Sequence, residues 1–158
     1  MSIIFVNNIK DQSDKKKAFE IRNLVFCEEQ KVSKKIEFDG LDQFCDHYLA
    51  KINEVPIGTA RVREQTKGTY KIERMAVLYE HRMKGVGKAI IKNILKQYLA
   101  KNQNINLVLN SQINAKDFYK KFGFLQEANG MKFTRTVNDD DTFTLTVRGP
   151  DYRWEAVK

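Results

Sequence analysis

With 158 residues and 42% hydrophobic side chains, the chain has the size of one ordinary globular domain with a core of its own. Its apolar runs are shorter than the ~20 residues that a membrane helix requires. Its N-terminus lacks the basic and apolar segments of a signal peptide. These features exclude a membrane-spanning protein and favour a cytoplasmic one, while the formal net charge of +8 favours an anionic partner.

The lysines are spread along the sequence and are not interleaved with aromatic residues. This pattern is typical of a solvated surface, so we expect no nucleic-acid partner and no membrane partner. A local positive field would still suit an acyl-CoA or a sugar phosphate. The two cysteines, Cys27 and Cys45, lack the spacing of metal ligands or of a C-x-x-C pair. We therefore predict reduced, buried thiols and no metal site.

The first part of the chain predicts a strand, a helix, a loop and a hairpin. Helix-starting residues at 11–14 precede apolar residues at helical spacing, and alternating residues mark the hairpin strands. The long polar connection is a candidate functional loop. The expected elements are a strand at 2–7, a helix from 11 to about 30, the connection at 31–46, and strands at 47–52 and 55–63 turned at 53–54.

The second part predicts strands that alternate with helices and then a second hairpin. We find no repeat, low-complexity segment or linker, so the chain is interpreted as a single α/β domain over 1–158, with a core at 1–137 and a C-terminal hairpin and tail at 138–158. The expected elements are strands at 70–77, 105–109, 132–137 and 142–147, helices at 85–100 and 114–121, and a tail at 151–158.

The most informative stretch is 72–91, where an apolar strand leads through a charged turn to a helix that opens with Gly85 and Gly87. The N–H groups at the start of a helix lack partners within the helix and face the positive end of its dipole, so they bind anions. The basic residues Arg82, Lys84 and Lys88 surround this point. The spacing does not fit the P-loop, and it fits only part of the dinucleotide fingerprint.

Arg82-x-x-Gly85-x-Gly87 resembles the acetyl-CoA signature of the GNAT superfamily of N-acetyltransferases. A second stretch, 114–124, resembles the A-x-x-F-Y-x-x-x-G-F motif of the same superfamily, and 22–30 resembles the R-x-x-V-F-x-E-E-Q motif of one bacterial-type branch. The resemblance implies a GNAT fold, with a central, mixed, mostly antiparallel twisted sheet. The sheet would have six to seven strands, about four flanking helices and a splay at the cofactor site.

The resemblance also implies how acetyl-CoA would be held. Pantetheine would pair with the backbone of the fourth strand, whose side chains are expected in the core, and the pyrophosphate would lie at the glycine-containing turn. The residues that match the cofactor positions are Met75, Ala76, Val77, Arg82, Met83, Lys84, Gly85, Val86, Gly87, Lys88, Asn110, Asn114 and Tyr119.

Two residues are candidates for catalysis. Tyr119 matches the family's general acid, and a phenol with a pKa of ~10 can protonate a thiolate whose conjugate acid has a pKa near ~8.5; the alternative is a tyrosine that only packs. Glu73, expected on the same face as Met75, is the best-placed carboxylate to act as base. A water relay, Glu29, or a purely structural ion pair of Glu73 are alternatives.

The acceptor is predicted to be the primary amine of a small molecule, with glucosamine 6-phosphate as the named guess. Residues 71–77 resemble the I-E-D-x-x-V strand of glucosamine-phosphate acetyltransferases, except that arginine replaces the aspartate. The alternatives are a protein, peptide or polyamine acetyltransferase and a non-enzymatic acyl-CoA- or RNA-binding module. The C-terminal hairpin and tail could complete the sheet, cover the acceptor pocket or exchange across a homodimer. His47 is expected to be a core or strand histidine and not a catalytic one. The candidate acceptor contacts are Glu29, Gln30, Asp39, Asp42, Arg61, Arg63 and Arg74.

Overall fold

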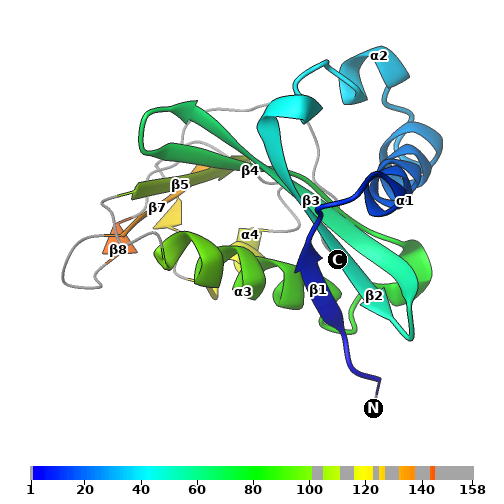
Figure 1. Cartoon of the computed structure of the whole chain (residues 1–158). Coiled ribbons are helices and arrows are strands. Elements are labelled where there is room, and N and C mark those ends of the chain that lie inside the picture. Colours follow the sequence, from blue (N-terminus) through cyan, green and yellow to red (C-terminus); the bar gives the residue numbers. More distant parts are fainter. Residues whose placement is uncertain are drawn as a thin grey trace.

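A mixed β-sheet runs through the centre of the molecule (Figure 1). The computed structural model describes residues 2–100, 105–110, 116–122, 125–126, 132–137 and 143–144. The strands are β1 (Phe5–Asn8), β2 (Cys45–Ile52), β3 (Val55–Thr66), β4 (Thr69–Val77), β5 (Ile105–Asn110), β6 (Leu125–Gln126), β7 (Lys132–Val137) and β8 (Phe143–Thr144). The helices are α1 (Gln12–Arg22) with a π-helical continuation (Asn23–Glu29), α2 (Lys34–Glu37), α3 (Val86–Leu99) and α4 (Lys116–Lys120).

The strands follow the order β1-β2-β3-β4-β5-β7-β6, and β8 pairs with β7. Among the pairs within the described residues, β4–β5 is parallel and the others are antiparallel. The predicted mixed, mostly antiparallel sheet with about four helices is confirmed. Within the described part of the chain the sheet has eight strands instead of six or seven, because the two-residue strands β6 and β8 extend the pairing of β7.

Two apolar clusters cover the two faces of the sheet. One joins α3 to β2, β3, β4 and β5, and the other joins α1 and its continuation to Leu49 of β2 and Ala76 of β4 (Figure 1). Apolar residues at helical spacing on α3 face the sheet, and Ile90, Ile91 and Ile94 among them are fully inaccessible. A Cβ at Gly58 would lie 2.9 Å from Val86 Cγ1, so this glycine allows α3 to approach the sheet closely.

Local signals predicted the first helix and hairpin correctly. The Asp11 side chain caps α1 by accepting a hydrogen bond from the Asp14 backbone N–H at 2.8 Å. Asn53 and Glu54, with φ angles of 48° and 65°, form the tight turn between β2 and β3. The thiols of Cys27 and Cys45 are free, but both residues are half-buried, whereas burial was predicted.

Strand β4 contains a bulge that the sequence did not predict. Its register with β3 shifts between Thr59 and Arg61, and Arg74 adopts a φ of 55°. The extra residue places the side chains of Glu73 and Arg74 on the face that α1 covers, while Met75 belongs to the α3 cluster. The expectation that Glu73 and Met75 share a face is therefore wrong, because the bulge interrupts the alternation.

The pairing of β4 with β5 ends at Ile72 and Leu109. The rest of β4, from Glu73 to Val77, pairs only with β3 among the described residues, so no described strand covers its other edge. This is the predicted splay of the sheet.

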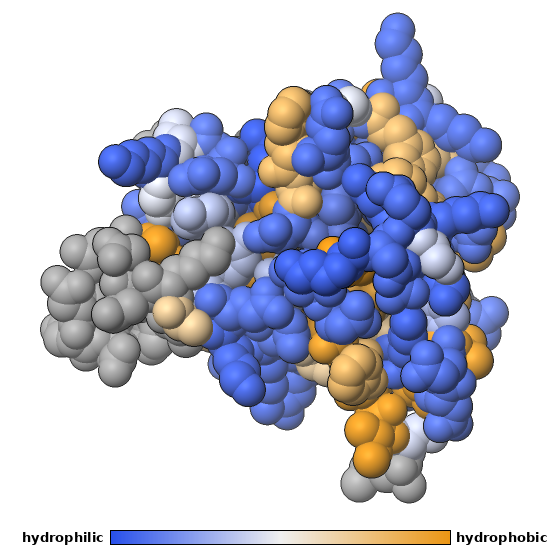
Figure 2. Space-filling view, viewed as in Figure 1, coloured by the Kyte–Doolittle hydropathy of each residue, from blue (hydrophilic) through white to orange (hydrophobic). Residues whose placement is uncertain are grey.

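The C-terminal region is described in part. The antiparallel pairing of β7 with β8 confirms the last hairpin, whose turn and outer ends lie outside the described residues. The predictions for Asn114 and for the tail at 151–158 also fall there. Within the described part of the chain, the helices are all too short or too polar to cross a membrane. The face in Figure 2 is mostly hydrophilic, and its apolar side chains form small separate areas.

Candidate functional site

The predicted anion-binding turn lies where β4 leads into α3. Gly85 occupies the N-cap position with a φ of 86°, which a glycine adopts without strain. Met83 also has a positive φ, of 61°, and is almost fully exposed. The 14-residue helix α3 begins directly afterwards, so its first N–H groups, which include those of Val86 and Gly87, are available at its N-terminus. Lys84 and Lys88 are exposed beside them.

The open edge of β4 offers backbone groups next to this turn. Leu78 donates its N–H to Ile57 O at 2.9 Å, toward β3. Because neighbouring residues of a strand direct their N–H and C=O groups to opposite edges, those of Val77 face the splay. The side chains of Met75, Ala76 and Val77 are buried, as predicted. Only their backbone can contact a ligand in the splay.

The side chain of Arg82 forms hydrogen bonds with other parts of the protein. Its Nε donates to the Val77 carbonyl at 2.8 Å, and its Nη1 donates to Glu29 Oε1 at 2.8 Å. The structure thus joins a residue predicted to contact the cofactor with a residue predicted to contact the acceptor. Gln30 follows Glu29 at the end of the first helix.

Tyr119 of α4 is fully buried and belongs to the same cluster as Met75 and Val77 of β4. Its ring meets that of Phe118 edge to face, with 5.1 Å between centroids. The predicted acid is therefore part of the apolar core on the α3 face of the sheet. Asn110 ends β5, just beyond the point where β5 parts from β4.

A buried network of charged side chains lies on the face of β3 and β4 that α1 covers, opposite the face that packs against α3. Arg61, with no exposed surface, contacts Glu73, Asp39 and Asp42 at 2.8 to 3.0 Å. Arg63 also donates to Glu73, at 3.1 Å, so Arg61 and Arg63 share a face of β3. The connection at 31–46 is thereby bound to the sheet.

Two further arginines complete the network. Arg22 contacts Glu37 at 2.9 Å and Asp42 at 2.7 Å, and Arg74 contacts Glu37 at 3.0 Å and Asp39 at 3.2 Å. Sequence reasoning missed Arg22 and Glu37 as members. Both residues are buried on helical segments, Arg22 on α1 and Glu37 on α2. A buried charge usually has an opposite charge beside it. The sequence near each residue does not indicate which opposite charge that is.

These contacts limit the predicted roles of Glu73 as a base and of Arg61 as a contact for the acceptor. Burial by itself raises the pKa of Glu73, but hydrogen bonding by Arg63 and the charges of Arg61 and Lys71 bring it below its ordinary value. Glu73 therefore stays ionised and is a weak proton acceptor. Each guanidinium nitrogen of Arg61 already contacts a carboxylate.

The same network makes the stability depend on pH. Burial lowers the pKa of His47, whose Nε2 lies 2.8 Å from the Asp42 carbonyl and whose Nδ1 is buried without a hydrogen-bond partner. The folded protein keeps this imidazole neutral, whereas the unfolded chain takes up a proton near pH ~6.5. The stabilisation is complete above that pH and is lost as the pH falls toward the pKa of the folded state.

We therefore expect the free energy of unfolding, measured by urea titration, to fall between about pH 7.5 and pH 5. The His47→Gln variant should lose most of this dependence, while His81→Gln, at the other histidine, should retain it. Further acidification should destabilise both variants, because the pKa values of Asp42 and Glu73 are also lowered and their stabilisation is lost when they are protonated. A pH profile that is unchanged in His47→Gln would contradict this assignment.

The chain is similar to known acetyltransferases in sequence and in fold. The family described as an acetyltransferase (GNAT) domain matches residues 11–135. A candidate acetyltransferase of Bacillus subtilis (strain 168) is 40% identical over 123 residues, which cover 75% of this chain and 82% of that protein. A solved candidate N-acetyltransferase from Lactobacillus plantarum has a TM-score of 0.73 at 20% identity, covering 83% of this chain and 94% of that one. An aminoglycoside 6′-N-acetyltransferase complexed with coenzyme A has a TM-score of 0.66 at 12% identity, covering 93% and 99%.

Proposed function

The chain belongs to the GNAT family of acetyltransferases and is an enzyme that uses acetyl-CoA, and we propose that its acceptor is the primary amine of a small molecule. The observation that carries the proposal is the edge of β4 that no described strand covers, which leads through a glycine-containing turn into the N-terminus of α3, while the buried Tyr119 belongs to the same apolar cluster as Met75 and Val77. These three features supply backbone pairing, an anion site and a proton donor for one bound molecule.

The residues present fit acetyl-CoA. The backbone of Met75 and Val77 is available to pair with an amide-containing chain, and the N–H groups at the start of α3 suit a pyrophosphate. Lys84 and Lys88 add positive charge beside them. When bound, acetyl-CoA supplies the acetyl group as a thioester.

The chain's own residues would then act by orientation and by proton transfer. The backbone of β4 holds the donor while the amine is placed for direct attack, which removes much of the entropic barrier. A β4 N–H facing the splay would polarise the reacting carbonyl. The Tyr119 hydroxyl would give its proton to the leaving sulfur.

The ion pairs of Glu73 favour a structural role over the predicted role as base. Its lowered pKa makes it a poor acceptor for the proton of an ammonium group. We propose that this proton leaves through water, which was one of the alternatives.

Within this substrate class we propose an amino-sugar phosphate, with glucosamine 6-phosphate as the first candidate. The similarity in fold to an aminoglycoside 6′-N-acetyltransferase supports an amino-sugar acceptor, and the net charge of +8 suits an anionic one. Arg61 and Arg74 already contact carboxylates and have almost no exposed surface. The phosphate contact would therefore fall to Arg63, whose side chain is 23% exposed.

The test is thiol release by the purified chain with acetyl-CoA and a panel of glucosamine 6-phosphate, glucosamine, a polyamine and a lysine peptide. We expect the fastest release with the amino-sugar phosphate. The Arg63→Gln variant should raise KM for this substrate about tenfold but leave KM for glucosamine unchanged. Fastest release with the peptide or polyamine would replace the proposed acceptor, and release no faster than the blank with all four would refute the proposal for this panel.

A further inference from the structure

The side chain of Arg82 links the end of β4 and the turn that follows it to the end of the first helix, which is distant in the sequence. Its Nε bonds the last carbonyl of β4, that of Val77, and its two terminal nitrogens bond the two carboxylate oxygens of Glu29. The guanidinium also lies over the Tyr79 ring, 5.5 Å from its centroid. Only 10% of the Arg82 side chain is exposed. A bidentate pair of this kind fixes orientation as well as distance.

The Val77 carbonyl is one of the groups that face the splay. Arg82 takes up one lone pair of this acceptor, so a ligand that pairs with β4 at this point relies mainly on the Val77 N–H. Arg82 thus marks the end of the open edge, directly before the turn that carries Met83 and Gly85. The position of its side chain determines where backbone pairing stops and where the anion site begins.

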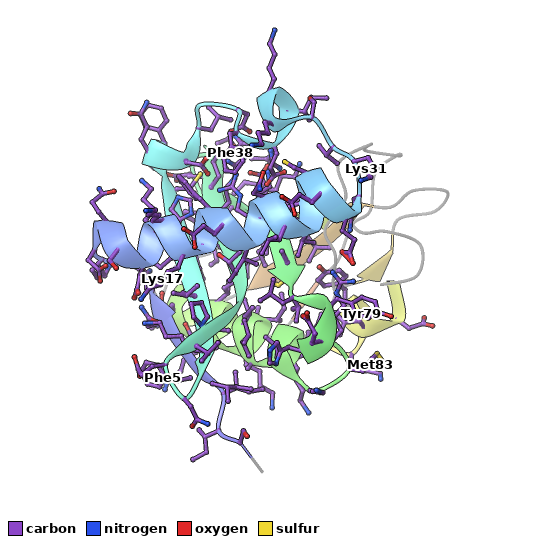
Figure 3. All side chains as sticks on the ribbon, turned by 90° about the vertical axis from the view of Figure 1, so that its right-hand side faces the viewer. Phe5, Lys17, Lys31, Phe38, Tyr79 and Met83 are labelled. Carbon is purple, nitrogen blue, oxygen red and sulfur yellow. The ribbon has the colours of Figure 1, made fainter. Side chains whose placement is uncertain are left out.

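Glu29 is itself firmly placed. It ends the π-helical continuation of α1, and the backbone on either side is held by bonds from Gln30 N to Val25 O at 3.1 Å and from Val32 N to Phe26 O at 2.8 Å. Phe26 is buried in the α1 cluster. In Figure 3, Lys31, just past this point, lies on the same side of the molecule as Tyr79 and Met83, whereas Lys17 lies toward the other end of α1.

We propose that Glu29 is a positioning residue for acetyl-CoA binding, which acts by holding Arg82 on the Val77 carbonyl. This inference rests on the proposed use of the β4 edge and the α3 N-terminus as the CoA site. It also replaces the predicted acceptor contact of Glu29, because both oxygens of its carboxylate are bound to Arg82.

A purely electrostatic role for Glu29 predicts the opposite result. Glu29 neutralises the charge of Arg82, so its removal would leave a stronger positive field for the pyrophosphate and would tighten CoA binding. A positioning role predicts weaker binding, because Arg82 would leave the Val77 carbonyl and lose its fixed orientation. The sign of the change therefore decides between the two.

The experiment is calorimetric titration of CoA, which requires no acceptor. We expect Glu29→Gln to weaken the Kd about tenfold. Glu29→Asp should weaken it similarly, because the charge remains but the shorter side chain does not reach both nitrogens. Glu28→Gln removes the same charge from the neighbouring exposed position and should bind like the wild type. Arg82→Lys should also weaken binding, and adding Glu29→Gln to it should cause little further loss.

Melting temperatures without CoA separate positioning from destabilisation, since positioning predicts weaker binding with a nearly unchanged Tm. Equal or tighter CoA binding by Glu29→Gln, or wild-type binding by Glu29→Asp, would overturn the inference. Failure of the wild-type chain to bind CoA would instead refute the proposed CoA site on which the inference rests.

Discussion

Replacement of Tyr119 by phenylalanine is expected to lower kcat by roughly 100-fold or more, since a positioned general acid contributes about 10²- to 10⁴-fold. The ring would keep its place in the core beside Phe118, so the free energy of unfolding should change little. The leaving thiolate would have to take its proton from water. Steady-state thiol release with saturating acetyl-CoA and acceptor measures the effect, and the Kd of CoA should stay near the wild-type value.

The matched control is Tyr98→Phe, which also removes a buried hydroxyl. The Tyr98 hydroxyl donates to Asp46 Oδ2 at 2.6 Å, and both residues lie outside the motif at 114–124 that contains Tyr119. Its loss should cost about 1–3 kcal/mol of stability, because the bond goes to a charged group, and should not change kcat. If Tyr119→Phe retains wild-type turnover, or if both variants lose turnover equally, the assignment of Tyr119 as acid is wrong.

Replacement of Arg61 by alanine is expected to destabilise the fold by about 3–5 kcal/mol. Removing one partner of a buried ionic group leaves the others without compensation, and here Glu73, Asp39 and Asp42 would all lose their contact with Arg61. The loss should appear as a lower midpoint in urea unfolding near pH 7. The loss should shrink in acid, because the buried carboxylates that no longer have Arg61 beside them take up protons at a higher pH than in the wild type.

Arg63→Ala is the comparison for Arg61, because Arg63 contacts the same carboxylate of Glu73 from a partly exposed position. Solvent screening reduces the expected loss to on the order of 1 kcal/mol. Equal destabilisation by the two variants would contradict the view that the network is centred on Arg61.

The sequence by itself determined the elements whose causes are local. Asp11 caps a helix with the residues that follow it, Asn53 and Glu54 turn a hairpin between adjacent strands, and the spacing of Ile90, Ile91 and Ile94 defines the buried face of α3. These patterns depend on neighbours within a few positions, so they can be interpreted without a fold. The motifs at 82–87 and 114–124 then indicated the family.

Only the tertiary structure decided how the charged residues of the site are used. The bulge at Arg74 depends on the register between β3 and β4, and a shift of one residue exchanges the faces of all the side chains that follow. The contacts of Arg61 with Asp39 and of Arg82 with Glu29 join residues 22 and 53 positions apart. Many arginines and carboxylates in the sequence could form such pairs, and only packing selects among them, because burial penalises every charge that is left without a partner.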